Sequence, residues 1–271
     1  MIPLEDNIGD IIGKAQHGLR ISDIELAEKA RVDPTHIHKL RGSDFDELIV
    51  WRIAPVLNLA ARALCDLATG SWHPGTIELE GLAQFTTHYH GMGVNAYLVW
   101  DLKSREAAVF DTGADCTEML SKVEKEKLSV KLILLTHAHP DHIADLARLV
   151  KETGAPVYLS EKESAPLAQP IEEGKHFRLG KIDIDTRLTW GHSRGGMTYV
   201  VNGLARKIAV VGDSLFAGSM GGGAVSYDDA LKNNLEKILT LPDETILCPG
   251  HGPMTTVGDE KVHNPFFSGQ V

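Results

Sequence analysis

The sequence THAHPDH, residues 136–142, follows the apolar run KLILL, residues 131–135, and is the most informative motif of the chain. The apolar run predicts a buried strand. Pro140 blocks continuation of that strand, so the motif is expected on a loop. A helix is expected over about 141–153, with its apolar residues on one face. This arrangement would gather imidazoles and a carboxylate at one point, which suits a transition metal better than it suits a solvated polar loop.

Three further candidate metal ligands lie downstream, each at the end of an apolar run that reads as a strand. They are His192 in TWGHSRGG (189–196), Asp213 in VVGDSLF (210–216) and His251 in CPGHGP (248–253). Glycine flanks each of them, which lets the backbone approach a metal closely. A single Gly-His or Gly-Asp pair is usually only a turn, but three in this order after residues 136–142 indicate one joint site.

The order of these motifs resembles the metallo-β-lactamase superfamily, and within it the branch of hydroxyacylglutathione hydrolase (glyoxalase II), over about residues 77–267. The resemblance implies an α/β fold, a four-layer αββα sandwich with two metal ions at one edge. The ligands it implies are His137, His139 and His192 for one ion, Asp141, His142 and His251 for the other, and Asp213 between them. It also implies that Asp111, in VFDTG (109–113), supports the site from behind the ligands.

Two divalent ions that share Asp213 and a water would lower the pKa of that water toward neutrality and supply hydroxide. Thioesters suit such a site, because a thiolate can leave without a strong general acid. Asp141 and Asp213 are the expected catalytic residues, and zinc is the expected metal, with iron or manganese as alternatives. Ser193 lies beside His192, but no GxSxG motif surrounds it, so a serine hydrolase is rejected.

Other functions stay open at the level of sequence. A single ferrous ion held by His137, His192 and Asp213 would resemble the site of persulfide dioxygenases. A lactonase, a phosphodiesterase, or a regulator with a metal-dependent sensor domain would also fit the ligand pattern. His88 and His90 form a second HxH, which we interpret as loop histidines near the substrate entrance.

The chain departs from the glyoxalase II pattern in ways that predict weak glutathione specificity. The run Gly221–Gly223 stands where those proteins usually carry an arginine and an Asp-Phe pair. The sequence ends soon after Phe267, without the additional C-terminal helical region that helps glyoxalase II hold glutathione. Neither departure touches the proposed metal ligands.

The N-terminal part, residues 1–72, is expected to be a separate helical domain, followed by a hydrolase domain over 73–271. Ser22 can cap a helix over 23–30, and Asp33 can cap a second helix that begins at Pro34. The stretch 26–47 resembles the repressor-like helix-turn-helix family, which would present Thr35, His36, His38, Lys39 and Arg41 to DNA. Eleven acidic and eight basic residues over 1–70 give a net charge of −3, however, so docking or dimerisation is favoured and DNA binding is unlikely.

Bulk composition fits one large and one small globular domain: 271 residues, 43% hydrophobic and 24% charged. The net charge of −10 disfavours polyanion binding. No apolar run approaches the roughly 20 residues of a membrane span, so no membrane partner is expected. Three scattered cysteines, Cys65, Cys116 and Cys248, predict reduced thiols and a cytoplasmic protein. The expected partners are a small acyl thioester or ester and, for a homodimer, a second copy of the chain.

Short apolar runs with turns between them predict the strands of the sandwich. The expected strands are 77–79, 95–100, 107–110, 132–135, 156–159, 182–188, 199–201, 208–211 and 246–248. Helical patterns are expected over 117–127 and 227–239. Tyr199 could donate a hydrogen bond to the reacting group, but packing within its strand is the favoured interpretation.

Overall fold

Two six-stranded sheets face each other in the computed structural model, which describes residues 2–270. In spatial order, the first sheet consists of β1 (Leu82–Tyr89), β2 (Met92–Trp100), β3 (Glu106–Phe110), β4 (Ser129–Leu134), β5 (Val157–Ser160) and β6 (Ala168–Ile171). The second sheet consists of β12 (Thr255–Thr256), β11 (Ile246–Pro249), β10 (Ile208–Gly212), β9 (Met197–Asn202), β8 (Ile182–Leu188) and β7 (His176–Leu179). One apolar cluster fills the space between the sheets, because alternate strand residues point inward from both.

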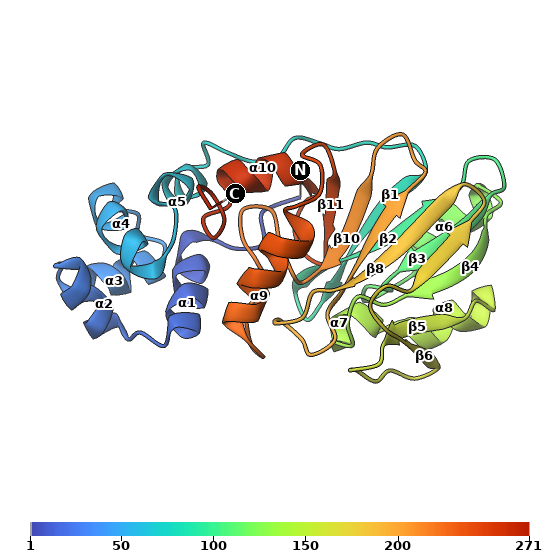
Figure 1. Ribbon diagram of the computed structural model, residues 1–271, viewed down its shortest axis with the longest axis horizontal. Coiled ribbons are helices and arrows are strands. Elements are labelled where there is room, and N and C mark those ends of the chain that lie inside the picture. The colour runs from blue at the N-terminus through green and yellow to red at the C-terminus, as the bar shows by residue number, and fades with distance from the viewer. Residues whose placement is uncertain (1, 271) are drawn as a thin grey trace.

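Helices cover the outer faces of both sheets (Figure 1). The first sheet is covered by α6 (Thr117–Lys125) and α8 (Leu146–Thr153). The second sheet is covered by α9 (Tyr227–Asn233), its π-helical continuation (Asn234–Ile238) and α10 (Val257–His263). The expected α/β sandwich of four layers is therefore confirmed. No helix among residues 2–270 is long and apolar enough to cross a membrane.

Parallel pairing brings several strand ends to one edge of the sandwich. In the first sheet β3 runs parallel to β4, with Phe110 opposite Leu134. In the second sheet β10 runs parallel to β11, with Gly212 opposite Pro249. Since the carboxyl ends of parallel strands lie at the same edge, the segments that follow these four strands meet there.

The N-terminal helical unit, in blue to cyan, lies beside the sandwich on the side of α9 and α10 (Figure 1). It consists of α1 (Ile8–Leu19), α2 (Asp23–Ala30), α3 (Pro34–Arg41), α4 (Glu47–Ile53), the 3₁₀ turn Ala54–Leu57 and α5 (Ala61–Ala68). The expected caps are present: Ser22 and Glu25 form a reciprocal capping box, and Asp33 accepts a hydrogen bond from the backbone of Thr35. The likeness of α2 and α3 to a DNA-binding unit stays a prediction.

The helical unit shares one apolar cluster with the outer layer of the second sheet. The cluster runs from Ile12 and Leu57 to Tyr227 and Phe267. Gly18 of α1 packs so closely on α9 that a Cβ built there would lie 2.2 Å from the Tyr227 ring. The helices are thus joined to the sandwich through packed side chains, while the division at residue 72 stays a prediction.

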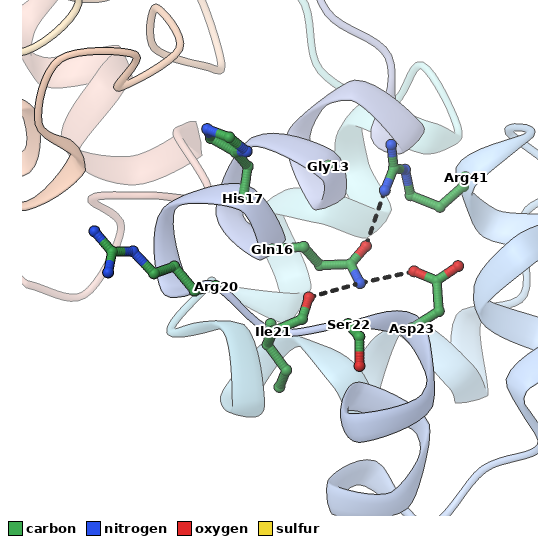
Figure 2. Close-up of a pocket in the computed structure, with 8 residues that line it drawn as sticks. All are labelled: Gly13, Gln16, His17, Arg20, Ile21, Ser22, Asp23 and Arg41. Atoms are coloured by element: carbon green, nitrogen blue, oxygen red, sulfur yellow. Dashed lines mark hydrogen bonds between the residues drawn. The ribbon is translucent and has the colours of Figure 1, made fainter.

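A buried amide joins the first three helices (Figure 2). The Gln16 side chain accepts a hydrogen bond from Arg41 at 3.1 Å and donates one to Asp23 at 2.8 Å. His17 and Arg20 line the same hollow, with side chains directed away from this network. Arg41, which was a candidate for contacting DNA, is therefore engaged within the helical unit.

Three predicted elements differ in the structure. The helix expected over 141–153 is split into α7 (Pro140–Ile143) and α8. Asp145 stands at the break, where its carboxylate accepts a hydrogen bond from the backbone of Cys116. The helix expected over 227–239 changes to π-helical winding after Asn233.

The strand expected over 77–79 is wrong, because these residues pack on the inter-sheet cluster without pairing. Strand β1 begins only at Leu82, and β6, β7 and β12 were not predicted. The sequence of β1, LAQFTTHY, mixes apolar and polar residues and gives no apolar run. Its pairing with β2 over eight residue pairs supplies the stability that the local pattern does not show.

Candidate metal centre

The edge where the strand ends meet gathers all seven predicted ligands. His137 and His139 follow β4, and Asp141 and His142 belong to α7. The remaining three are His192 after β8, Asp213 after β10 and His251 after β11. Segments far apart in the sequence therefore place seven imidazole and carboxylate groups at one point.

The first group of side chains surrounds His139. Its Nδ1 lies 3.0 Å from Nε2 of His137 and 3.1 Å from Nε2 of His192. Asp213 Oδ2 lies 3.4 Å from the same nitrogen of His192. These four ligand atoms lie within 4.8 Å of one another, which is compatible with a single ion among them.

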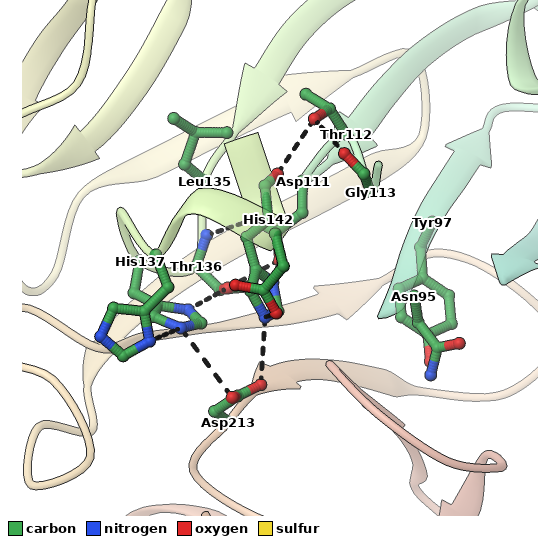
Figure 3. A network of polar contacts seen from close by, with 12 residues as sticks. Asn95, Tyr97, Asp111, Thr112, Gly113, Leu135, Thr136, His137, His142 and Asp213 are labelled. Atoms are coloured by element: carbon green, nitrogen blue, oxygen red, sulfur yellow. Dashed lines mark hydrogen bonds and ion pairs between the residues drawn. The ribbon is translucent and has the colours of Figure 1, made fainter. Parts of the chain in front are cut away.

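The second group consists of Asp141, His142 and His251, and it also adjoins Asp213. Figure 3 shows His142 and Asp213 facing each other. Asp141 Oδ2 lies 3.4 Å from Nε2 of His251 and 3.6 Å from Nε2 of His142. Asp213 lies 3.3 Å from both imidazoles, through Oδ1 to His142 and through Oδ2 to His251. The Asp213 carboxylate thus stands between the two groups, as the resemblance implied.

Two buried atoms at this junction have no hydrogen-bond partner among the described residues: Nε2 of His142 and Oδ1 of Asp213. Buried polar atoms are rarely left unpaired, because each forfeits its hydration. These two face each other, and a cation that both of them ligate would satisfy them together. The residues present therefore fit divalent metal ions.

The outer ring nitrogens of four histidines are fixed by neighbours. Nδ1 of His137 lies 3.0 Å from Thr136 Oγ1, and Nδ1 of His142 lies 2.9 Å from Asp111 Oδ2. Nδ1 of His192 lies 3.0 Å from the Gly222 carbonyl, and Nδ1 of His251 lies 2.6 Å from the Gly93 carbonyl. A carbonyl or carboxylate at Nδ1 favours the proton there and leaves the Nε2 lone pair directed toward the centre.

Asp111 holds the position that the resemblance implied, behind the ligands. Besides His142, it accepts hydrogen bonds of 2.7 Å from the backbone and the hydroxyl of Thr136. Its backbone φ of 56° lies in the left-handed region, which costs free energy for a residue with a Cβ. The three bonds fix this conformation and connect the end of β3 to the segment after β4.

Charge–charge contacts determine the protonation of the centre without metal. Burial alone raises the pKa of Asp213, but His142 and His251 outweigh burial and hold it well below its usual value. Burial alone lowers the pKa of His142, but the Asp213 and Asp111 carboxylates raise it to about 10. The pKa of His137 falls well below its usual value through burial and through neighbouring His142.

Glu163 joins two of the ligand segments, and sequence analysis missed it. Its carboxylate accepts hydrogen bonds from the backbone of Ala138 at 2.6 Å and of Gly195 at 2.8 Å. These donors belong to the loops that carry His139 and His192. Glu163 lies in a polar stretch with no motif, so only the folded chain reveals the connection.

The glycine run also has a role that the sequence did not show. A Cβ built on Gly221 would lie 1.8 Å from the carbonyl oxygen of Asp213 and 3.0 Å from Nδ1 of His192. Only glycine allows the backbone to pass so close to two ligand residues. The run therefore packs against the candidate site itself.

Several other candidate side chains do not take part in the seven-residue cluster. Tyr199 is buried and donates a 2.7 Å hydrogen bond to the Leu135 carbonyl, which agrees with packing. Cys248 is buried, and burial raises the pKa of its thiol. His88 lies at the end of β1 rather than on a loop, and His90 lies in the turn before β2. Neither joins a metal-binding group within residues 2–270.

Comparison with known proteins gives consistent similarities. The family model described as the metallo-beta-lactamase superfamily matches residues 89–251. A probable metallo-hydrolase of Streptococcus pyogenes is 31% identical, over 68% of this chain and 89% of the relative. The hydroxyacylglutathione hydrolase GloC of Haemophilus influenzae is 28% identical, over 64% of this chain and 92% of the relative.

Solved structures show the same likeness. The B3 metallo-beta-lactamase BLEG-1 is 30% identical with a TM-score of 0.61, covering 69% of this chain and all of that one. TTHA1623 in a di-iron-bound form is 32% identical with a TM-score of 0.53, covering 67% of this chain and 99% of that one. The N-terminal residues up to 88 lie outside the family match.

Proposed function

The chain belongs to the metallo-beta-lactamase superfamily, and from that membership we propose that it is a metal-dependent hydrolase of thioesters or related acyl esters. The observation that carries the proposal is the position of Asp213, within 3.4 Å of imidazoles from both groups. A shared carboxylate of this kind suits two divalent ions that act together on one reacting group.

The roles we propose for the side chains follow from their positions. His137, His139 and His192 would hold one ion, and Asp141, His142 and His251 the other, with Asp213 between them. Asp141 and Asp213 are the catalytic carboxylates of this proposal. When bound, the ions would polarise the acyl oxygen and lower the pKa of a water molecule. We propose zinc, which suits imidazole and carboxylate ligands, with iron or manganese as alternatives.

No side-chain nucleophile competes with a water molecule in this proposal. The Ser193 hydroxyl is buried and has no hydrogen-bond partner among the described residues, so no base is placed to activate it. A thiolate leaving group needs no strong acid, which agrees with a site built from metal ligands alone. The relative GloC, named a hydroxyacylglutathione hydrolase, supports thioesters as the substrate class.

A substrate comparison tests the proposal. We expect an acyl-glutathione and a simple acyl thioester such as an N-acetylcysteamine ester to be hydrolysed with a kcat/KM ratio well below a hundredfold, about 2.7 kcal/mol. Asp141→Ala and His251→Ala should reduce the metal content toward one equivalent, and both should strongly reduce the rate of thioester hydrolysis. A different outcome would favour the mononuclear iron dioxygenase instead. In that case the protein would hydrolyse no thioester and would take up oxygen with a persulfide, and both variants would keep this oxygen uptake in full.

We also propose that the helical unit is a docking or dimerisation element and no DNA reader. Its net charge is −3 over residues 1–70, and Arg41 is engaged by Gln16. Sedimentation would reveal a homodimer, and a titration against duplex DNA at physiological salt should show no selective binding. Sequence-selective binding in the nanomolar range would instead support the regulator hypothesis.

A further inference from the structure

The N-terminal arm, residues 2–7, starts beside β11 and α10 and only then enters the helical unit (Figure 1). The Ile2 carbonyl lies 3.1 Å from Nε2 of His73. A Cβ built on Gly252 would lie 3.2 Å from the backbone nitrogen of Glu5. The arm thus lies against the segment that carries His251, although it belongs to the part of the chain outside the family match.

Two side chains of this region hold the glycine loop, which we define as residues 216–223. Lys14 of α1 forms an ion pair with Asp6 and donates a 2.8 Å hydrogen bond to the Met220 carbonyl. Asp6 also accepts a 2.5 Å hydrogen bond from the Ser219 hydroxyl. The side chains of Asp6 and Lys14 are only 8% and 20% exposed, so water competes little for these contacts.

The glycine loop contacts two of the candidate ligands, His192 and His251. Gly222, two residues after Met220, offers its carbonyl to Nδ1 of His192. At the start of the loop, the Lys14 ammonium lies 5.0 Å from the centre of the Phe216 ring. That ring stands edge-on to His251, with 5.6 Å between centroids. Lys14 therefore contacts Phe216, which packs on His251, and Met220, which lies two residues before the partner of His192.

Helix α10 and Asn264, which follows it, hold Gly218 and Ser219 of the glycine loop but do not bond the Met220 carbonyl. Glu260 accepts a hydrogen bond from the backbone of Gly218, and Asn264 donates one to the Ser219 carbonyl. Lys14 is the side chain that bonds the Met220 carbonyl among the described residues. The position of the Gly222 carbonyl therefore depends on Lys14 of α1 as well as on α10.

We propose that Asp6 and Lys14 are positioning residues of the metal centre. They hold the glycine loop so that the Gly222 carbonyl accepts the Nδ1–H of His192, which keeps Nε2 of this imidazole available to the first ion. The proposal requires that the site binds metal, but it does not depend on which substrate is hydrolysed. It gives the helical extension a function that reaches into the candidate site.

The test compares Lys14→Met with a matched control, Lys122→Met, in the full chain. Lys122 resembles Lys14 because it pairs with Glu126 and lies over an aromatic ring, that of Trp100, yet it belongs to α6 on the other sheet. Two readouts are needed: the tautomer of His192 from ¹⁵N chemical shifts of the metal-free protein, and Zn²⁺ affinity by competition with a chromophoric chelator. Lys14→Arg and Asp6→Asn complete the set.

We expect Lys14→Met to mix the tautomers of His192 and to weaken binding of the ion at its site about tenfold, the lower end of the effect of losing a supporting hydrogen bond. Asp6→Asn should do the same more weakly, Lys14→Arg should restore both readouts, and Lys122→Met should change neither. Unchanged tautomer and affinity in both Lys14→Met and Asp6→Asn would overturn the proposal. So would equal changes in Lys122→Met, because they would reflect general destabilisation.

Discussion

The edge of the sandwich and the helical unit use their charged side chains in opposite ways. At the edge, Asp111, Asp141 and Asp213 are buried or nearly so, and within residues 2–270 no lysine or arginine forms an ion pair with them. In the helical unit, charged residues such as Asp33 and Glu25 lie at the surface and cap helices. Buried carboxylates whose charged neighbours are imidazoles suit the binding of a cation, whereas exposed capping residues contribute to local stability alone.

The comparison also identifies the junction where the two regions meet. Asp6 and Lys14 form a well-covered ion pair, unlike the exposed Arg62–Asp66 pair in the same unit, where the arginine side chain is 79% exposed. Exposed pairs contribute little to stability, since water and salt compete for them. The Asp6–Lys14 pair is largely buried and also bonds the glycine loop. We therefore expect this pair to affect the candidate site directly.

The largest effect on the metal centre is expected from Asp213→Ala. The change removes the carboxylate between the two groups. His251 loses its nearest carboxylate, and His142 loses one of the carboxylates that face it. We expect loss of both ions and a fall in thioester hydrolysis of roughly a thousandfold or more, about 4 kcal/mol. Elemental analysis and kcat/KM check this, with Asp185→Ala on β8 as an exposed control. Normal metal content in Asp213→Ala would contradict the proposed role of this carboxylate in holding the ions.

A smaller effect is expected from Glu163→Gln. An amide offers one acceptor where the carboxylate offers two, so either the Ala138 or the Gly195 backbone loses its partner. Metal affinity at the His139 and His192 group should fall about tenfold, as for other residues that orient ligands. Chelator competition measures this fall, and Glu161→Gln provides the control because that side chain is exposed. Equal affinity of the two variants would show that Glu163 has no positioning role.

The smallest effect on the metal centre is expected from Glu260→Gln. This substitution should leave metal binding unchanged and alter only how the free energy of unfolding depends on pH. Burial raises the pKa of Glu260 from 4.5 to about 8, although Asn264, Thr255 and the Gly218 backbone donate to it. A raised pKa in the folded state means that its stabilisation is fully present below pH 4.5 and is lost as pH rises through about 8. Glutamine stays neutral: its oxygen can accept from Gly218 and Asn264, and its amide nitrogen can donate to the Thr255 hydroxyl.

Urea unfolding of the metal-free protein between pH 4.5 and 8 tests this sign. The free energy of unfolding of the wild type should fall relative to that of Glu260→Gln as pH rises, by about 1.4 kcal/mol for each unit by which the folded pKa is raised. Metal content should not change. A constant difference between the two proteins across this range would show that Glu260 is ionised in the folded state.

Motifs that follow strands were the features most readily predicted from sequence. The 136–142 motif, His192, Asp213 and His251 each stand where a strand ends, so local pattern and the parallel pairing of sheets suffice to bring them together. The capped helices of the N-terminal unit were predictable for a similar reason, because each cap lies within three residues of its partner.

Contacts between distant segments could not be predicted in this way. Glu163 bonds segments on either side of it in the chain, and Lys14 bonds Met220 across 206 residues of sequence. Neither contact leaves a local pattern, since one carboxylate or ammonium looks like any other surface charge until the chain is folded. Strand β1 escaped detection because it has no apolar run, and its pairing with β2 stabilises it instead.

Anomalous scattering from crystals of the protein purified without added metal would reveal directly whether the site binds two ions. We expect two peaks, one among His137, His139 and His192 and one among Asp141, His142 and His251, with Asp213 contacting both. Elemental analysis of the same protein should give two equivalents of transition metal. A single peak held by His137, His192 and Asp213, with Asp141 and His251 outside bonding distance, would contradict the two-metal site and with it the proposed hydrolase.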